Sequence, residues 1–157
     1  MIPPRPIIQA HILCLSSIRF SKRLLLRRGR WGATCHHLAM LIEIVACSSE
    51  DAKTAERAGA NRVELCSAIH LGGLTPSLGT LIQAKATVGT PVAPMVRPRP
   101  AGSCYTRAEF DTMCRDVDLF ADHGADAIVT GVLNEDGTLD LDRNSELVRR
   151  AGKVPVS

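Results

Sequence analysis

The sequence predicts an α/β fold in which parallel strands alternate with helices. Apolar runs of strand composition alternate with longer segments typical of helices, about one pair every 30 residues, as βαβ crossovers require. The junctions repeat, because "AERAGANRVEL" and "FADHGADAIVT" share a helix end, a Gly-Ala pair and a strand start. The strands are rich in Val, Ile and Ala on both faces, which suits a parallel sheet covered by helices.

The first unit begins with the short β-rich run "LIEIVA" at residues 41–46. The segment after it, "SSEDAKTAERAGA", is predicted to be a helix. Ser48 or Ser49 can cap this helix, acidic residues favour its first turn, and Gly59 supplies the left-handed residue after its last turn. A second strand, "NRVELC", follows and ends at Cys66.

The second helix is predicted to have Thr75 as its N-cap and Pro76 at its first position, before "SLGTLIQAKATVG". The third strand is "TPVAPMV". The third helix, "TRAEFDTMCRDVDLFADHG", is capped by Thr106 and repeats apolar side chains at helical spacing. A fourth strand "ADAIVTGVL", a turn "NEDGT", a fourth helix "LDRNSELVRRAG" and the start of a fifth strand "KVPVS" complete the order (βα)₄β.

Two architectures fit this order, an open doubly wound sheet and part of a (β/α)₈ barrel. The first strand–helix turn, "VACSSED", lacks the G-x-G-x-x-G pattern of dinucleotide-binding folds, which disfavours the first architecture. A complete barrel needs about 250 residues, and residues 40–157 are about half of that. We therefore expect a truncated TIM barrel of about four βα units plus the start of strand 5.

Charge divides the chain into a basic leader, residues 1–39, and an acidic body. The leader holds seven of the 19 Lys and Arg residues and no acidic residue, so the body has 19 − 7 = 12 basic and 16 acidic residues. An acidic body with three aromatic residues repels phosphate backbones and offers no base-stacking surface, so we expect no nucleic-acid partner. We expect no membrane partner, since no run approaches the ~20 apolar residues of a membrane span.

The leader is predicted to be disordered, and two origins for it remain open. Its Arg-rich, Ser-containing, acid-free composition fits a mitochondrial transit peptide. Alternatively, Met40 is the natural start and the leader is translated upstream sequence. The six cysteines form no C-x-x-C pair, so free thiols are expected rather than a structural zinc site.

Three stretches of the body strongly resemble one known family: "IEIVACSSEDA…AERAGANRVELCSAIHLGGLTPSLGTL", "PVAPMVRPRPAGSCYTRAEFDTM" and "GADAIVTGVLNEDGTLDLD". The patterns R-[VI]-E-L-C-S with G-G-L-T-P-S, and M-[VI]-R-P-R, are specific to the copper homeostasis protein CutC family. The similarity runs from Leu41 to Ser157. It implies a (β/α)₈ barrel, an association with copper, a homo-oligomer, and a cytoplasmic location, or a mitochondrial one if the leader is a genuine transit peptide.

Cys47 and Cys66 are the candidate ligands of Cu(I). Strand alternation places Cys66 on the same face as Glu64. It places Cys47 on the same face of its own strand as Glu43. Barrels keep their active positions at the carboxyl ends of strands, and two converging thiolates suit Cu(I). The resemblance implies copper ligation at Cys66, but Val45 occupies the family's second cysteine position. Either Cys47 substitutes for that cysteine, or the copper pair is lost and both thiols are small buried hydrophobes.

A second function class is an enzyme that acts on a small anionic substrate. Glu43 and Glu64 lie on adjacent strands and could form an acid–base pair. Arg62, Arg97 and Arg99 could clamp a carboxylate or a phosphate. The alternative for both sets is charge neutralisation, with the glutamates paired to the arginines inside the barrel. Whether the chain is an enzyme stays open, and a third interpretation is an inactive truncated product with exposed strand edges.

Overall fold

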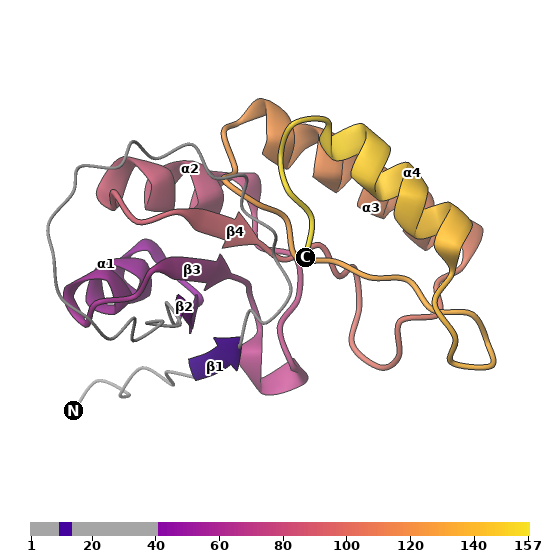
Figure 1. Cartoon of the computed structure of the whole chain (residues 1–157), viewed down its shortest axis with the longest axis horizontal. Helices are drawn as coiled ribbons and strands as arrows, with labels where there is room; N and C mark the ends of the chain where they lie inside the picture. Colours follow the sequence, from indigo (N-terminus) through magenta and orange to yellow (C-terminus); the bar gives the residue numbers. More distant parts are fainter. Residues whose placement is uncertain (1–9, 14–40) are drawn as a thin grey trace, which may run out of the picture.

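The computed structural model describes residues 10–13 and 41–157 and shows an α/β fold (Figure 1). Strands β2 (Leu41–Ala46), β3 (Arg62–Leu65) and β4 (Val92–Pro94) are hydrogen-bonded neighbours in this order. Both pairs of neighbours run parallel. The predicted α/β class with a parallel sheet is therefore confirmed.

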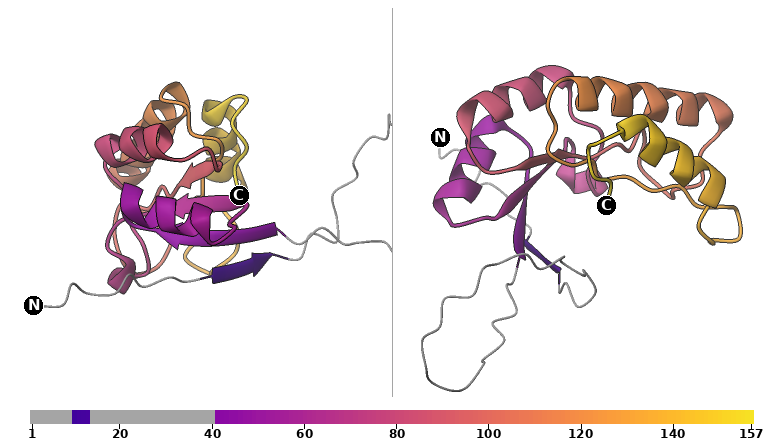
Figure 2. Two further views of the ribbon diagram at one scale, coloured as in Figure 1. Left: turned by 90° about the vertical axis from the view of Figure 1, so that its left-hand side faces the viewer. Right: turned by 45° about the horizontal axis from the view of Figure 1, so that its top comes forward.

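The described part of the chain has four helices, of which α1 and α2 each follow a strand, α3 follows β4, and α4 follows the isolated bridges after α3: α1 (Ser49–Arg57), α2 (Leu78–Thr87), α3 (Arg107–Asp122) and α4 (Leu141–Ala151). Each of them contacts the next helix along the chain, so that they follow one another around one side of the strands (Figure 2). A short 3₁₀ turn, η1 (Ile69–Leu71), lies in the loop after β3. Within residues 10–13 and 41–157, no helix has both the length and the apolar character needed to cross a membrane.

The hydrophobic core lies between the strands and the helices. Alternate strand side chains are buried there with side chains of the helices: Ile44, Ala46, Val63, Leu65, Val92, Leu81, Met113, Val117 and Leu147. Because side chains alternate along a strand, the residues between them, such as Glu43, Glu64 and Cys66, face the other side of the sheet. The sheet therefore separates an apolar layer under the helices from a layer that carries the functional groups.

Strand β1 (Ala10–Leu13) pairs antiparallel with β2, with Ala10 opposite Ile44. At these four residues the structure differs from the disorder expected of the leader. The physical reason is that β2 is the edge of the parallel sheet, and its outer backbone groups can pair with an extended segment. The other residues of the leader, and with them most of the predicted transit peptide, lie outside the described residues.

The predicted fourth strand, residues 125–133, is not a continuous strand. Two single parallel bridges remain, one from Val129 to the end of β4 and one from Ile128 to Val156. They extend the parallel order of the sheet as far as the predicted start of strand 5. The parallel pairing does not continue to residue 133, because Leu133 forms an antiparallel bridge with Leu139, which follows the turn.

The N-cap of helix α2 is Ser77, so the prediction that Thr75 caps this helix is wrong. Ser77 Oγ accepts a hydrogen bond from the backbone N–H of Thr80 at 3.1 Å. Thr75 binds the end of β4 instead, because its Oγ1 accepts from the Arg97 backbone N–H at 2.9 Å and its own N–H donates to the Arg97 carbonyl at 3.0 Å. The proline therefore precedes the helix.

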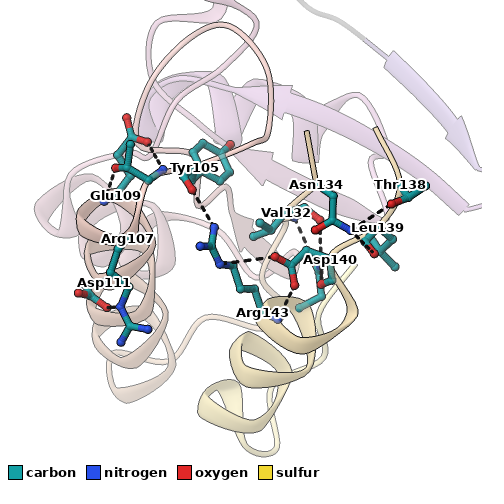
Figure 3. A network of polar contacts seen from close by, with 12 residues as sticks. Tyr105, Arg107, Glu109, Asp111, Val132, Asn134, Thr138, Leu139, Asp140 and Arg143 are labelled. Atoms are coloured by element: carbon teal, nitrogen blue, oxygen red, sulfur yellow. Dashed lines mark hydrogen bonds and ion pairs between the residues drawn. The ribbon is translucent and has the colours of Figure 1, made fainter. Parts of the chain in front are cut away.

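Helix α3 begins after Thr106, the N-cap residue that the sequence predicted, and the start is a capping box. The Thr106 hydroxyl accepts from the Glu109 backbone N–H at 3.3 Å, and the Glu109 carboxylate accepts from the Thr106 backbone N–H at 2.7 Å. Figure 3 shows Glu109 at this helix start and Arg143 of α4 nearby. Arg143 donates to the Tyr105 carbonyl at 2.7 Å and forms an ion pair with Asp140 at 3.5 Å, which joins the starts of α3 and α4.

Replacing Thr106 with alanine is expected to lower the free energy of unfolding by about 1 kcal/mol, because the helix start loses its side-chain acceptor. Urea unfolding followed by circular dichroism measures this loss. Thr112→Ala in the same helix is the matched control, since Thr112 is exposed and its hydroxyl only donates to the Ala108 carbonyl at 3.0 Å. Equal effects of the two substitutions would contradict the capping role.

Candidate metal-binding site

The carboxyl ends of β2 and β3 bring two thiols together. Ala46 lies opposite Leu65 in the parallel register, so Cys47 and Cys66 form the next pair along the strands. The Cys66 N–H donates to the Ala46 carbonyl at 2.9 Å, which extends the backbone pairing to this point. The two sulfur atoms are 3.7 Å apart.

The two thiols differ in their surroundings. Cys66 is fully buried, whereas Cys47 is partly exposed. Burial, together with the neighbouring Cys47, Glu64 and Asp51, raises the pKa of the Cys66 thiol to about 12. Cys66 therefore keeps its proton at neutral pH unless a metal ion displaces it.

The start of α1 holds Cys47 in place. The Asp51 carboxylate accepts a hydrogen bond from the Cys47 backbone N–H at 3.1 Å. Asp51 is itself fixed, because its backbone N–H donates to Oγ of the N-cap residue Ser48 at 3.1 Å. Cys47 also lines a cavity of about 360 Å³ between the starts of α1 and α2, so its thiol is accessible from that side.

The row of Cys47 and Cys66 continues onto β4 at Met95. Leu65 lies opposite Pro94, and the Met95 N–H donates to the Leu65 carbonyl at 2.8 Å, so Met95 is the neighbour of Cys66. Met95 lines a second cavity of about 240 Å³. Met95 was not among the site residues predicted from the sequence, although its position near the end of the third predicted strand matches that of Cys66 at the end of the second.

The two candidate acid–base residues precede the thiols along their strands. Glu43 is buried and forms an ion pair with Arg62 on the neighbouring strand. Glu64 is also buried and lies in register with Val45 on one side and Ala93 on the other. The Glu43–Arg62 pair is one of the charge neutralisations that the sequence left open.

The three arginines considered as an anion clamp lie in three different surroundings. Arg62 belongs to the ion pair just described. Arg97 Nη1 donates to two carbonyls of the loop after β3, at 2.9 and 3.0 Å. Arg99 Nε donates to the Glu109 carboxylate at 2.5 Å, at the start of α3. The structure therefore does not gather these guanidinium groups around one point.

Across the described ranges, 10–13 and 41–157, no three His, Cys, Asp or Glu side chains lie close enough together to hold a metal ion. In the described part of the chain, Cys47 and Cys66 are therefore two candidate ligands without a third His, Cys, Asp or Glu beside them. A metal bound there would take any further ligand from another residue type or from a small molecule.

Comparisons with known proteins address the family. A model of the CutC family matches residues 40–157. The chain belongs to the CutC family. A CutC family protein from Treponema denticola is 53% identical over 110 residues, and one from Klebsiella pneumoniae is 43% identical over 117 residues. The alignments cover 70% and 74% of this chain and 45% and 47% of those proteins, so the chain spans about half the length of the curated CutC relatives it matches.

A solved CutC structure shares the fold. The crystal structure of a Streptococcus agalactiae protein, assigned as a copper homeostasis protein CutC, is similar to this chain with a TM-score of 0.69 and 30% sequence identity. The similarity covers 73% of this chain and 56% of that chain. The family membership expected from the sequence motifs is therefore confirmed, together with an α/β fold built on a parallel sheet.

Proposed function

We propose that this CutC chain handles copper and that Cys47 and Cys66 bind Cu(I) as a pair of thiolates. The observation that carries the proposal is the 3.7 Å separation of the two sulfur atoms at the carboxyl ends of neighbouring parallel strands. Thiolates are soft ligands that select Cu(I), whereas carboxylates and carbonyls suit Mg²⁺ and Ca²⁺. The assignment of the Streptococcus agalactiae protein to copper homeostasis supports the same metal here.

The architecture that fits this function is the first half of a (β/α)₈ barrel. Parallel strands β2 to β4, the two parallel bridges beyond them, and helices that each contact the next one support this arrangement. In such a barrel the thiols lie on the inner face near the mouth, where functional groups are found. We infer a cytoplasmic location, because two free thiols stay reduced there.

The position of Cys47 favours its use as the second ligand. Val45 occupies the position where the resemblance places the family's second cysteine, and its buried side chain offers no ligand atom. Cys47 follows two residues later on the same face of β2. Because its sulfur lies within 3.7 Å of the Cys66 sulfur, substitution of one cysteine position for another explains the geometry better than loss of the site.

Replacing Cys66 with serine is expected to weaken Cu(I) binding about a hundredfold, since the loss of a ligand costs at least as much as the loss of the groups that orient one. Cys47→Ser is expected to have a similar effect. Anaerobic competition with a chromophoric Cu(I) chelator measures both affinities. Cys104→Ser is the matched control, because Cys104 is an exposed free thiol outside the pair. Wild-type affinity in the double variant of Cys47 and Cys66 would remove the thiol pair from the proposal.

A second candidate function is an enzyme for a small anionic substrate, and the 240 Å³ cavity beside β4 favours it. Arg97, Ser103 and Thr130 line this cavity together with apolar side chains. Glu43 and Glu64, both buried on neighbouring strands, are the acid–base candidates for this function. Thermal unfolding with small phosphates and carboxylates tests this function. Stabilisation that Arg97→Gln abolishes would support it, and no stabilisation at millimolar concentrations would exclude it.

A further inference from the structure

We propose that Met95 supplies a third sulfur ligand, so that Cu(I) is held by two thiolates and one thioether. The inference rests on the proposed copper function and names the complete protein ligand set of that site. Cys47, Cys66 and Met95 occupy one row across three neighbouring parallel strands. Thioethers, like thiolates, are soft ligands that select Cu(I).

Met95 and Cys66 both pack against Gly73. A Cβ atom placed on Gly73 would lie 3.0 Å from Met95 Sδ and 3.4 Å from Cys66 Cβ. Both side chains therefore lie against the same small space, which is open only because residue 73 has no side chain. The backbone φ of Gly73 is +82°, a left-handed conformation that also favours glycine. The loop after β3 thus leaves room for the thioether beside the buried thiol.

The spacing of the two thiols favours three ligands over two. With metal–thiolate bonds of about 2.3 Å, a linear two-coordinate ion needs sulfur atoms about 4.6 Å apart, and a trigonal ion needs them about 4.0 Å apart. The observed separation of Cys47 Sγ and Cys66 Sγ is 3.7 Å, which is too short for a linear ion and fits an ion that has further ligands beside the two thiolates. A trigonal ion needs a third ligand, and Met95 is the next residue in the row.

The electrostatics of the site favour a neutral third ligand. Cys66 is fully buried, and the two thiolates already bring negative charge to the site. A third anionic ligand would add to this buried charge, whereas a thioether carries none. Among the described residues no third His, Cys, Asp or Glu joins the thiols, so the methionine does not compete with a ligand of those types.

Nuclear magnetic resonance of the methionine methyl groups tests the ligand directly. The full chain is labelled with ¹³C at its four methionine methyl groups and titrated anaerobically with Cu(I) alone, and then with Ag(I), a soft ion that does not change oxidation state. The Met95 methyl resonance is expected to shift in proportion to the metal bound. Met113 is the internal control, because it lies on the buried face of α3 in the core and its resonance should stay in place.

Substitution gives a second, independent measurement. Met95→Leu is expected to weaken Cu(I) binding about tenfold in the chelator competition, and the two thiolates should retain the remaining affinity. Met113→Leu is the matched control and should bind Cu(I) as the wild type does. Circular dichroism of both variants shows whether the fold is kept, since leucine replaces methionine with little change in volume.

The outcomes separate this inference from the copper function on which it rests. A Met95 methyl shift together with weaker binding by Met95→Leu supports the three-sulfur site. An unmoved methyl resonance overturns it, whether or not the substitution weakens binding, because Met95 would then only pack beside the thiols. In that case loss of binding in Cys66→Ser would still support the thiol pair. Unchanged binding in the cysteine variants would instead overturn the copper site itself.

Discussion

An Arg62→Met variant is expected to be less stable than the wild-type chain by about 3–5 kcal/mol, because it leaves the Glu43 carboxylate buried without its ion-pair partner. The Glu43 side chain is 3% exposed and that of Arg62 is 19% exposed. The carboxylate therefore gains little from solvent when the guanidinium is removed. Urea unfolding gives the free energy of unfolding for both chains, and an unchanged slope would show that the unfolded states are comparable.

Two controls show whether the loss comes from the buried charge. The double variant Arg62→Met, Glu43→Leu should recover most of the stability, since removing both partners removes the cost of burying a lone charge. Arg107→Met breaks an exposed ion pair with Asp111, at 3.0 Å, and is expected to change stability by about 0.5 kcal/mol or less. If Arg62→Met and Arg107→Met had equal effects, burial of Glu43 would not be the cause.

Local signals predicted most of the helices, and the exception shows what such signals omit. Ser48 and Thr106 cap α1 and α3 as their sequence positions indicated. Thr75 and Ser77 are both acceptable caps for α2 by residue type alone. The choice depends on Arg97, whose backbone binds Thr75 from the end of another strand. A tertiary contact of this kind has no local signature in the sequence.

In the sheet and the site, too, local patterns were predictable from the sequence, whereas features that depend on contacts between strands were not. Strand alternation was sufficient to place each cysteine on the same face of its own strand as a glutamate, but the 3.7 Å separation of the two sulfur atoms depends on the register between the strands. Met95 was missed because its place beside Cys66 depends on the register of a third strand. The proposed anion clamp of Arg62, Arg97 and Arg99 did not anticipate that each guanidinium has a nearer partner.

The pH dependence of copper binding is the second large effect that the structure predicts. The apparent affinity for Cu(I) is expected to rise at least about tenfold per pH unit from about pH 6 to about pH 9, or at least about a thousandfold in all, because Cys66 releases one proton across this whole range. Burial, together with the neighbouring Cys47, Glu64 and Asp51, raises the pKa of Cys66 to about 12. The empty site therefore holds the Cys66 proton throughout this range, and Cu(I) must displace it.

The sign of the effect follows from competition between the proton and the metal for one sulfur atom. Each rise of one pH unit lowers the proton activity tenfold, and release of one proton from Cys66 becomes easier by the same factor. Affinity should thus increase with pH until the pKa of Cys66 is reached. Chelator competition at several pH values, corrected for protonation of the chelator, gives the slope.

Cys66→Ser is the control for this measurement, because serine has no proton that titrates in this range. Its residual Cu(I) binding should rise less steeply with pH, by about one proton, than that of the wild type. A wild-type slope near zero would show that the Cys66 thiolate exists before the metal arrives. The buried thiol would then be stabilised as an anion, which is the opposite of what its surroundings of apolar atoms, Glu64 and Asp51 require.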